Sequence, residues 1–313
     1  MNLRHVLLVI VSLFMLACSS QEIKDDSEEP EEVGPAPLLD IDETVDVDVV
    51  WRRNLGSGIG KLNIRLKPAV SGDVVFMADY NGELSALELS SGDEIWSRSF
   101  DQKISGGVAV FGRDVYIATQ DGILHSIEKS NGDINWSQPL SSESIAPVVA
   151  DAQQVYIRTI DGHMTAFNRK TGKQNWTYEA VLPVLTVHGT AAPVLMHNLV
   201  ISGFANGKLI ALDRELGIPR WNKRLAIPEG RSELERLVDL DGTPIVEDGI
   251  VYATAYHGKL AAIGFDGKTR WETELSSYFG PTLGLGNLYI TREDDHVQAY
   301  DQLNGASVWS QSS

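Results

Sequence analysis

The chain has 313 residues, a formal net charge of −17 and one cysteine. Such an acidic protein is poorly suited to bind nucleic acid or an anionic lipid surface, because both carry negative charge themselves. A single cysteine also excludes a disulfide framework within the chain.

Residues 1–17 predict an export signal, since a basic residue precedes an apolar run too short to span a bilayer. The run ends in Met15-Leu16-Ala17-Cys18, which resembles the lipobox of bacterial lipoproteins. That resemblance implies that Cys18 is lipidated, with palmitate in the anchor, and becomes the first residue of the mature protein. Ser19 stands where aspartate would favour the inner membrane, so the resemblance indicates the periplasmic face of the outer membrane. A plain signal peptide with an incidental cysteine remains the alternative.

Residues 18–45 predict an acidic tether. Twelve Asp or Glu residues and one Lys between positions 20 and 49 give this stretch a net charge of −11. Prolines and few large apolar residues accompany the charge, a composition typical of extended, disordered linkers. We expect it to serve as a soluble spacer, with a docking role as the alternative.

Residues 46–313 contain a repeat that is marked by all seven tryptophans. Successive tryptophans are separated by 45, 40, 40, 45, 50 and 38 residues, and six of them follow a glycine by four positions. A fixed period near 40 indicates an array of one supersecondary unit. The tryptophans are Trp51, Trp96, Trp136, Trp176, Trp221, Trp271 and Trp309.

Each repeat predicts four strands. A segment that often begins with proline, such as 68–70, is followed by a β-rich run such as 115–117. An Asn-Gly or Asp-Gly pair in four copies, and His257-Gly258 in the fifth, then predicts a type I′ hairpin, whereas the sixth copy has Asp295-His296. The third strand carries a small residue about ten positions before the tryptophan of the fourth. No sustained helical periodicity interrupts the array.

The predicted fold class is therefore all-β. One four-stranded antiparallel sheet cannot bury both of its faces, whereas radial stacking of such sheets does so in a β-propeller. We expect each tryptophan to pack against the neighbouring blade. An ordinary sandwich with tryptophans in its core is the alternative, and the constant glycine-to-tryptophan spacing disfavours it.

The sequence offers no catalytic constellation. Its histidines lack zinc-ligand spacing, and neither a Gly-x-Ser-x-Gly elbow nor a P-loop occurs. The glycine-rich stretch 55–60 precedes no predicted helix, so a nucleotide loop is not expected there. We therefore predict no metal, no cofactor and no enzymatic activity.

The blade motif Ala211-Leu212-Asp213 through Gly217 to Trp221 resembles the tryptophan-docking blade of pyrroloquinoline quinone (PQQ) dehydrogenases. Those enzymes hold the quinone and a calcium ion on an eight-bladed propeller. They are much larger, and Cys18 cannot supply the disulfide that covers the cofactor in many of them. A PQQ-dependent periplasmic dehydrogenase is therefore the alternative function, because a shared fold does not imply a shared site.

A lipoprotein built of such blades is similar to the BamB family, over roughly residues 45–313. The resemblance implies a non-enzymatic scaffold of the outer-membrane β-barrel assembly machinery in a Gram-negative bacterium. It implies docking on the periplasmic POTRA domains of BamA and assistance to the insertion of outer-membrane proteins. Recognition of unfolded barrel strands by strand addition stays open, as does binding of the propeller lipoprotein to another envelope partner.

The same resemblance implies two partner-binding loops. The first has Leu185, Val187 and His188 where the family has a Leu-x-Leu-Arg-Gly motif, so His188 departs from arginine. The second has Asp239 and Asp241 in an Asp-x-Asp motif, with Arg236 nearby, where the repeat is longest. Loops that break a repeat are common binding sites. The alternative is that both aspartates only cap a turn.

The family propeller has eight blades, whereas six complete sets of strands precede the end of this sequence. Trp51 then belongs to a closing strand whose blade is otherwise missing. We expect the sequence to be truncated at the C-terminus by roughly 70 residues. An open ring with exposed edges beside Trp51 and Trp309 follows from this expectation.

Overall fold

Antiparallel sheets make up the part of the chain that the structure describes. The computed structural model describes residues 45–56, 58, 64, 66–186, 189 and 191–312. The expected signal peptide (1–17), lipidation at Cys18 and nearly all of the tether lie outside these residues and stay predictions. Among the described residues, no helix has the length and apolar character needed to cross a membrane.

In this described part, six sheets of four strands each follow one another in chain order, and within each sheet consecutive strands pair with one another. The first three sheets contain β1 (Ala69–Ser71), β2 (Val74–Ala78), β3 (Glu83–Glu88) and β4 (Glu94–Ser99); β5 (Ile104–Phe111), β6 (Asp114–Thr119), β7 (Ile123–Glu128) and β8 (Ile134–Pro139); β9 (Val149–Ala150), β10 (Gln154–Arg158), β11 (His163–Asn168) and β12 (Gln174–Glu179). The last three contain β13 (Val194–Met196), β14 (Leu199–Phe204), β15 (Lys208–Asp213) and β16 (Pro219–Arg224); β17 (Ile245–Glu247), β18 (Ile250–Thr254), β19 (Gly258–Gly264) and β20 (Thr269–Leu275); β21 (Thr282–Gly284), β22 (Asn287–Thr291), β23 (His296–Asp301) and β24 (Ser307–Ser312).

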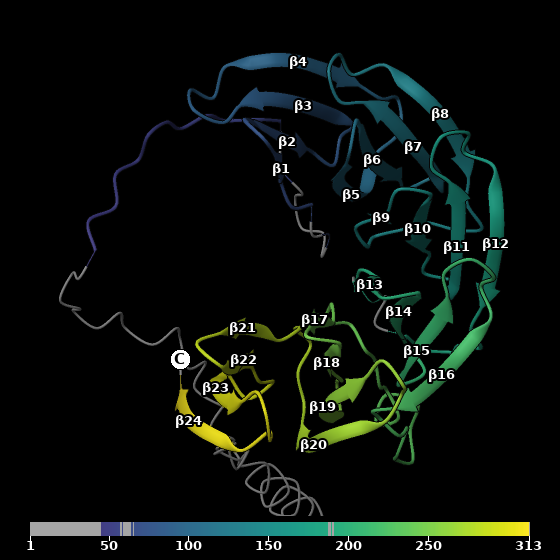
Figure 1. Cartoon of the computed structure of the whole chain (residues 1–313), viewed down its shortest axis with the longest axis vertical. Coiled ribbons are helices and arrows are strands. Elements are labelled where there is room, and N and C mark those ends of the chain that lie inside the picture. Colours follow the sequence, from purple (N-terminus) through teal and green to yellow (C-terminus); the bar gives the residue numbers. More distant parts are fainter. Residues whose placement is uncertain are drawn as a thin grey trace, which may run out of the picture. The chain divides into compact units, whose positions relative to one another are not determined.

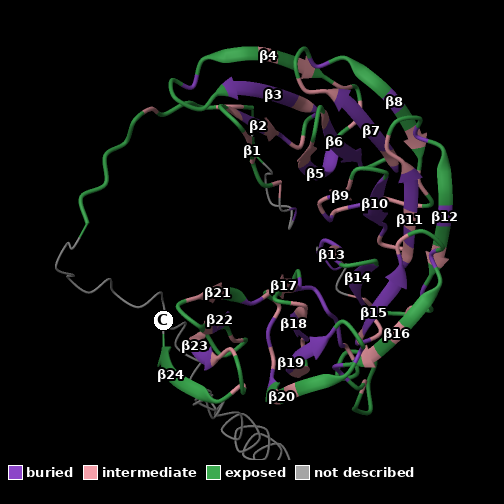
Figure 2. Ribbon diagram, in the orientation of Figure 1, coloured by how far each residue is buried: buried purple, intermediate pink, exposed green. Residues whose placement is uncertain are grey.

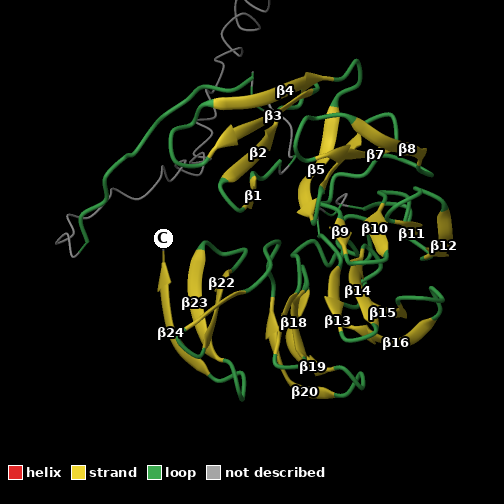
Figure 3. Ribbon diagram, turned by 45° about the horizontal axis from the view of Figure 1, so that its top comes forward, coloured by secondary structure: helices red, strands yellow, loops and turns green. Residues whose placement is uncertain are grey.

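Residues from Asp46 onward form one compact unit, in which the sheets are arranged radially (Figure 1). The first strand of each sheet lies innermost and the fourth outermost. The second and third strands are mostly buried, whereas the fourth strands expose most of their length (Figure 2). In a tilted view, the described residues that connect the strands form loops and turns (Figure 3). The predicted all-β propeller of four-stranded blades is confirmed.

A row of three side chains crosses each sheet at the same register. In the third sheet Tyr156 pairs with Ala166, which in turn pairs with Trp176. The rings of Tyr156 and Trp176 lie 6.0 Å apart across the small alanine. A register shift directly after the small residue occurs in all six sheets. The small residue therefore makes room for the tryptophan ring within its own sheet.

The tryptophans also join neighbouring sheets. Six indole Nε1 groups donate hydrogen bonds to backbone carbonyls of the following sheet, for instance from Trp176 to Arg214 at 2.8 Å. The same rings lie on the positive-φ glycines of that sheet, where a Cβ on Gly217 would stand 2.5 Å from Trp176. The other donors and acceptors are Trp51 and Leu89, Trp96 and Lys129, Trp136 and Arg169, Trp221 and Phe265, and Trp271 and Gln302. The expected packing of tryptophans between blades is confirmed for these six and explains the glycine-to-tryptophan spacing, whereas Trp309 has no following sheet among the described residues to pack on.

The two ends of the array differ from the rest. Trp51 docks on the first sheet as five other tryptophans dock on theirs, yet residues 46–53 belong to none of the six sheets. Trp309, on β24, keeps 43% of its surface exposed, whereas Trp176 keeps 8%. The structure therefore does not show a closed ring of six sheets in which the Trp51 segment pairs inside a sheet. The expected truncation itself stays a prediction.

The hairpin turns between second and third strands differ from the expected type. A type I′ turn needs two consecutive residues at positive φ. In the second sheet only Gly122 has positive φ (73°), and its N–H bonds to the carbonyl of Thr119 at 3.0 Å. The type I′ prediction is therefore wrong, because the asparagine or aspartate lies before the single left-handed position. In the sixth sheet Asp295 occupies that position, with φ of 59°.

Candidate functional site

Two long loops lie side by side on one rim of the array. We call residues 180–193, between β12 and β13, the first rim loop, and residues 225–244, between β16 and β17, the second rim loop. The N–H of Ala192 donates to Oγ1 of Thr243 at 3.1 Å and joins their C-terminal ends. A cavity of about 440 Å³ between them is lined by Val181 and Pro183 of the first loop and Pro228 of the second.

The first rim loop exposes aliphatic side chains. Val181 is 87% exposed, Val184 99% and Leu185 42%. The amide of Asn206 bonds to the carbonyl of Val181 at 2.8 Å and holds the start of the loop. Of the predicted partner-binding residues, Leu185 is thus on the surface as expected, whereas Val187 and His188 lie outside the described residues. Their roles stay predictions.

The second rim loop has an exposed tip. Leu234 is 71% exposed and Ile227 is 59% exposed. Arg236 is also exposed, and its N–H bonds to the carbonyl of Ser232 in the turn at the tip. The carboxylate of Glu235 accepts hydrogen bonds from backbone N–H groups of the tip, which hold its pKa below the ordinary value. The predicted contact residue Arg236 is therefore reachable by a partner.

Asp239 and Asp241 occupy the opposite, inner part of the second rim loop. Asp239 is fully buried and Asp241 is 8% exposed. The carbonyl of Asp239 accepts a hydrogen bond from the N–H of Tyr256 at 2.8 Å, so the loop is fastened to the fifth sheet. Whether either aspartate serves partner binding stays a prediction. In this structure both carboxylates are buried and are not presented on the surface of the rim.

Sequence reasoning did not identify Arg158, at the end of β10. Its side chain is 5% exposed, and its Nη1 donates to the carbonyl of Gly203 at 2.9 Å. Aligning the six sheets on the small residue of the third strand would have drawn attention to it, because Arg158 is charged where the others have small residues. Those are Ala78, Ala118, Gly203, Thr254 and Thr291.

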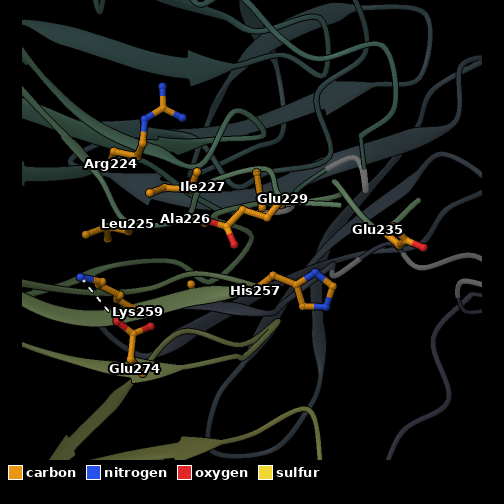
Figure 4. A pocket seen from close by; sticks show the side chains of 11 residues that line it. Arg224, Leu225, Ala226, Ile227, Glu229, Glu235, His257, Lys259 and Glu274 are labelled. Carbon is orange, nitrogen blue, oxygen red and sulfur yellow. Dashed lines mark ion pairs between the residues drawn. The ribbon is translucent and has the colours of Figure 1, made fainter. Parts of the chain in front are cut away.

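A second cavity, of about 540 Å³, lies under the second rim loop (Figure 4). Arg224 and Lys259 contribute positive charge to its wall, and Glu229, Glu235 and Glu274 contribute negative charge. His257 also lines it, with Nδ1 3.0 Å from the carbonyl of Leu237. Such mixed charge without a nucleophile–base pair fits recognition of a polar surface. In the parts of the chain that the structure describes, no three His, Cys, Asp or Glu residues could hold a metal ion together.

Comparisons with known proteins identify relatives over nearly the whole chain. The family model described as outer membrane protein assembly factor BamB matches residues 41–105 and 81–311. The chain is 47% identical to the BamB of Pseudomonas aeruginosa, over 98% of this chain and 79% of that protein. It is 34% identical to the BamB of Escherichia coli, over 100% of this chain and 82% of that protein.

Solved structures agree with these relatives. The crystal structure of BamB from Moraxella catarrhalis matches with a TM-score of 0.75 and 29% identity, over 80% of this chain and 76% of that one. A europium-containing methanol dehydrogenase matches with a TM-score of 0.56 and 13% identity, over 79% of this chain and 68% of that one, which shows a shared fold alone. From the tryptophan-docked blades, the matched family model and these identities, we conclude that the chain belongs to the BamB family of outer membrane protein assembly factors.

Proposed function

We propose that this protein is a non-enzymatic scaffold that docks on the POTRA domains of BamA through its two rim loops. In this role it assists the insertion of outer-membrane proteins as part of the β-barrel assembly machinery. Lipid attached to Cys18 anchors it to the periplasmic face of the outer membrane. The acidic tether then acts as a spacer between the anchor and the propeller.

One observation carries the proposal: aliphatic side chains are exposed on the adjoining rim loops. Val184 and Leu234 expose 99% and 71% of their surfaces. Large apolar side chains that gather on a rim beside charged cavities are typical of a protein-binding surface. The tryptophans between neighbouring sheets, such as Trp176 at 8% exposure, are instead largely buried by packing.

The test is co-purification of BamA with the tagged chain from cell envelopes. The double variant Val184→Asp with Leu185→Asp places charge where the partner would bury aliphatic groups. Losing these contacts should cost at least about 2 kcal/mol of binding free energy, roughly a thirtyfold weaker complex. Both positions are exposed, so the melting temperature should stay that of the parent.

Leu216→Asp is the matched control. Leu216 is 59% exposed on the opposite rim, in the turn between β15 and β16. BamA should co-purify with this variant as with the parent. Full retention of BamA by the Val184 and Leu185 variant would exclude the first rim loop as a docking site.

A further inference from the structure

A buried guanidinium lies beneath both rim loops. Nη1 of Arg158, in the third sheet, donates to the carbonyl of Gly203 in the fourth sheet at 2.9 Å. Its guanidinium carbon lies 5.6 Å from the ring centre of Phe204. Arg158 therefore links two neighbouring sheets at the rim where the loops leave them.

The first rim loop meets this guanidinium at Gly189. A Cβ placed on Gly189 would lie 3.0 Å from Nη2 of Arg158, 3.0 Å from Oδ1 of Asp241 and 3.4 Å from Oδ1 of Asp239. The backbone of the first loop is thus wedged between the arginine and the carboxylates of the second loop. A side chain at Gly189 would therefore push these groups away by a few tenths of an ångström.

The second rim loop surrounds the same point. A Cβ on Gly203 would lie 2.5 Å from Cβ of Leu240, so the residue between the two aspartates packs on the strand that Arg158 contacts. Burial lowers the pKa of Arg158, while the charges of Asp239 and Asp241 act in the opposite direction. An arginine stays charged in such a site, and a buried charge depends strongly on its counter-ions.

We propose that Arg158 is a positioning residue, whose guanidinium holds the first and second rim loops in the single arrangement that a partner recognises. The proposal rests on the proposed function for its binding consequence, but its structural part concerns this chain alone. Arg158 is too buried to touch a partner. It acts through Gly189 on one side and through Asp239 and Asp241 on the other.

Other contacts keep the sheets together without this arginine. The indole of Trp176 bonds to the carbonyl of Arg214 at 2.8 Å and lies on Gly217, which joins the third and fourth sheets. The N–H of Tyr256 bonds to the carbonyl of Asp239 and fastens the second loop to the fifth sheet. Removal of the guanidinium should therefore loosen the loops and leave the propeller folded.

The first test is hydrogen–deuterium exchange on the whole chain without partner. Arg158→Met keeps most of the side-chain length and removes the charge. Amides of residues 184–186, 189, 191–192 and 237–242 should exchange at least about tenfold faster, in both loops together, while β14 and β15 stay protected. Arg214→Met is the matched control, since Arg214 pairs with Asp151 at 3.3 Å between the same two sheets on the opposite rim. That variant should leave both rim loops protected.

Asp241→Asn removes a negative charge of the second loop near Arg158, and should raise the amide exchange rates of the same two segments. It also serves if Arg158→Met proves unable to fold. Unchanged exchange in either loop of a folded variant at Arg158 or Asp241 would overturn the proposal, because the loops would then be held independently.

The second test is the affinity of these variants for the purified POTRA domains of BamA. Arg158→Met should weaken binding at least about tenfold, and Arg158→Lys, which keeps a charge facing the carboxylates, should recover part of the loss. Equal losses of POTRA affinity for Arg158→Met and Arg158→Lys would show that Arg158 acts only through packing, and would contradict the proposal. Failure of the parent chain to bind the POTRA domains would refute the proposed function, while the exchange measurement would still decide the role of Arg158.

Discussion

Replacing a docked tryptophan should destabilise the protein far more than replacing Trp309. Trp176 is 8% exposed and Trp309 is 43% exposed, so the two differ by about a third of the side-chain surface. A third of ~250 Å² at ~25 cal/mol per Å² corresponds to about 2 kcal/mol. The hydrogen bond from Trp176 to Arg214 adds about 1 kcal/mol.

We therefore expect Trp176→Ala to lower the free energy of unfolding by about 3–5 kcal/mol, and Trp309→Ala to lower it by about 3 kcal/mol less. Both residues pack on a tyrosine of their own sheet, Tyr156 and Tyr289, at 6.0 and 5.9 Å between ring centres, so contacts within the sheet are matched. Urea unfolding followed by far-ultraviolet circular dichroism measures the difference without relying on tryptophan fluorescence. Equal losses for the two variants would refute the conclusion that docking between sheets stabilises the array.

Two further predictions concern a glycine and a buried histidine. Gly217→Ala should lower the free energy of unfolding by about 2 kcal/mol or more, because its Cβ would stand 2.5 Å from the ring of Trp176. Gly72→Ala is the control, at a similar positive φ with open space around it, and should cost only about 1 kcal/mol of backbone strain. Equal losses of stability in thermal unfolding would contradict this. Burial, followed by the charge of Arg98, lowers the pKa of His125 from 6.5 to about 4. In the unfolded chain His125 takes up a proton near pH 6.5, whereas in the folded chain it takes one up only near pH 4. The contribution of His125 to the free energy of unfolding should therefore fall as the pH drops from about 6.5 towards about 4, and stay constant above that range. The decline between about pH 7 and about pH 5 should be smaller in a His125→Gln variant, and an identical decline would contradict the assignment.

Local signals in the sequence were sufficient to predict the propeller. The spacing from Gly217 to Trp221 recurs because each turn glycine receives the tryptophan of the preceding sheet, Trp176 in this case. That contact needs a left-handed backbone and an absent side chain at the same position, and only glycine provides both. The β-rich runs and the turn residues that follow them located the second and third strands of each sheet.

The candidate site depended on contacts that the repeat does not encode. Asp239 and Asp241 were expected to stand beside the apolar anchor at a partner interface, yet the fold buries both beneath Gly189 of another loop. Such a meeting of two loops from different sheets leaves no periodic trace in the sequence. Arg158, in contrast, can be found from the repeat, because it is a charged residue at a register position where the other sheets have small residues. Its hydrogen-bond partner Gly203 became known only from the structure.

Site-specific photocrosslinking in living cells tests the central claim most directly. A photoreactive amino acid at Val184, which is 99% exposed on the first rim loop, should crosslink to the POTRA domains of BamA. The same group at Leu216, on the opposite rim, should not. Crosslinking to BamA from Leu216 and none from Val184 would contradict docking through the rim loops.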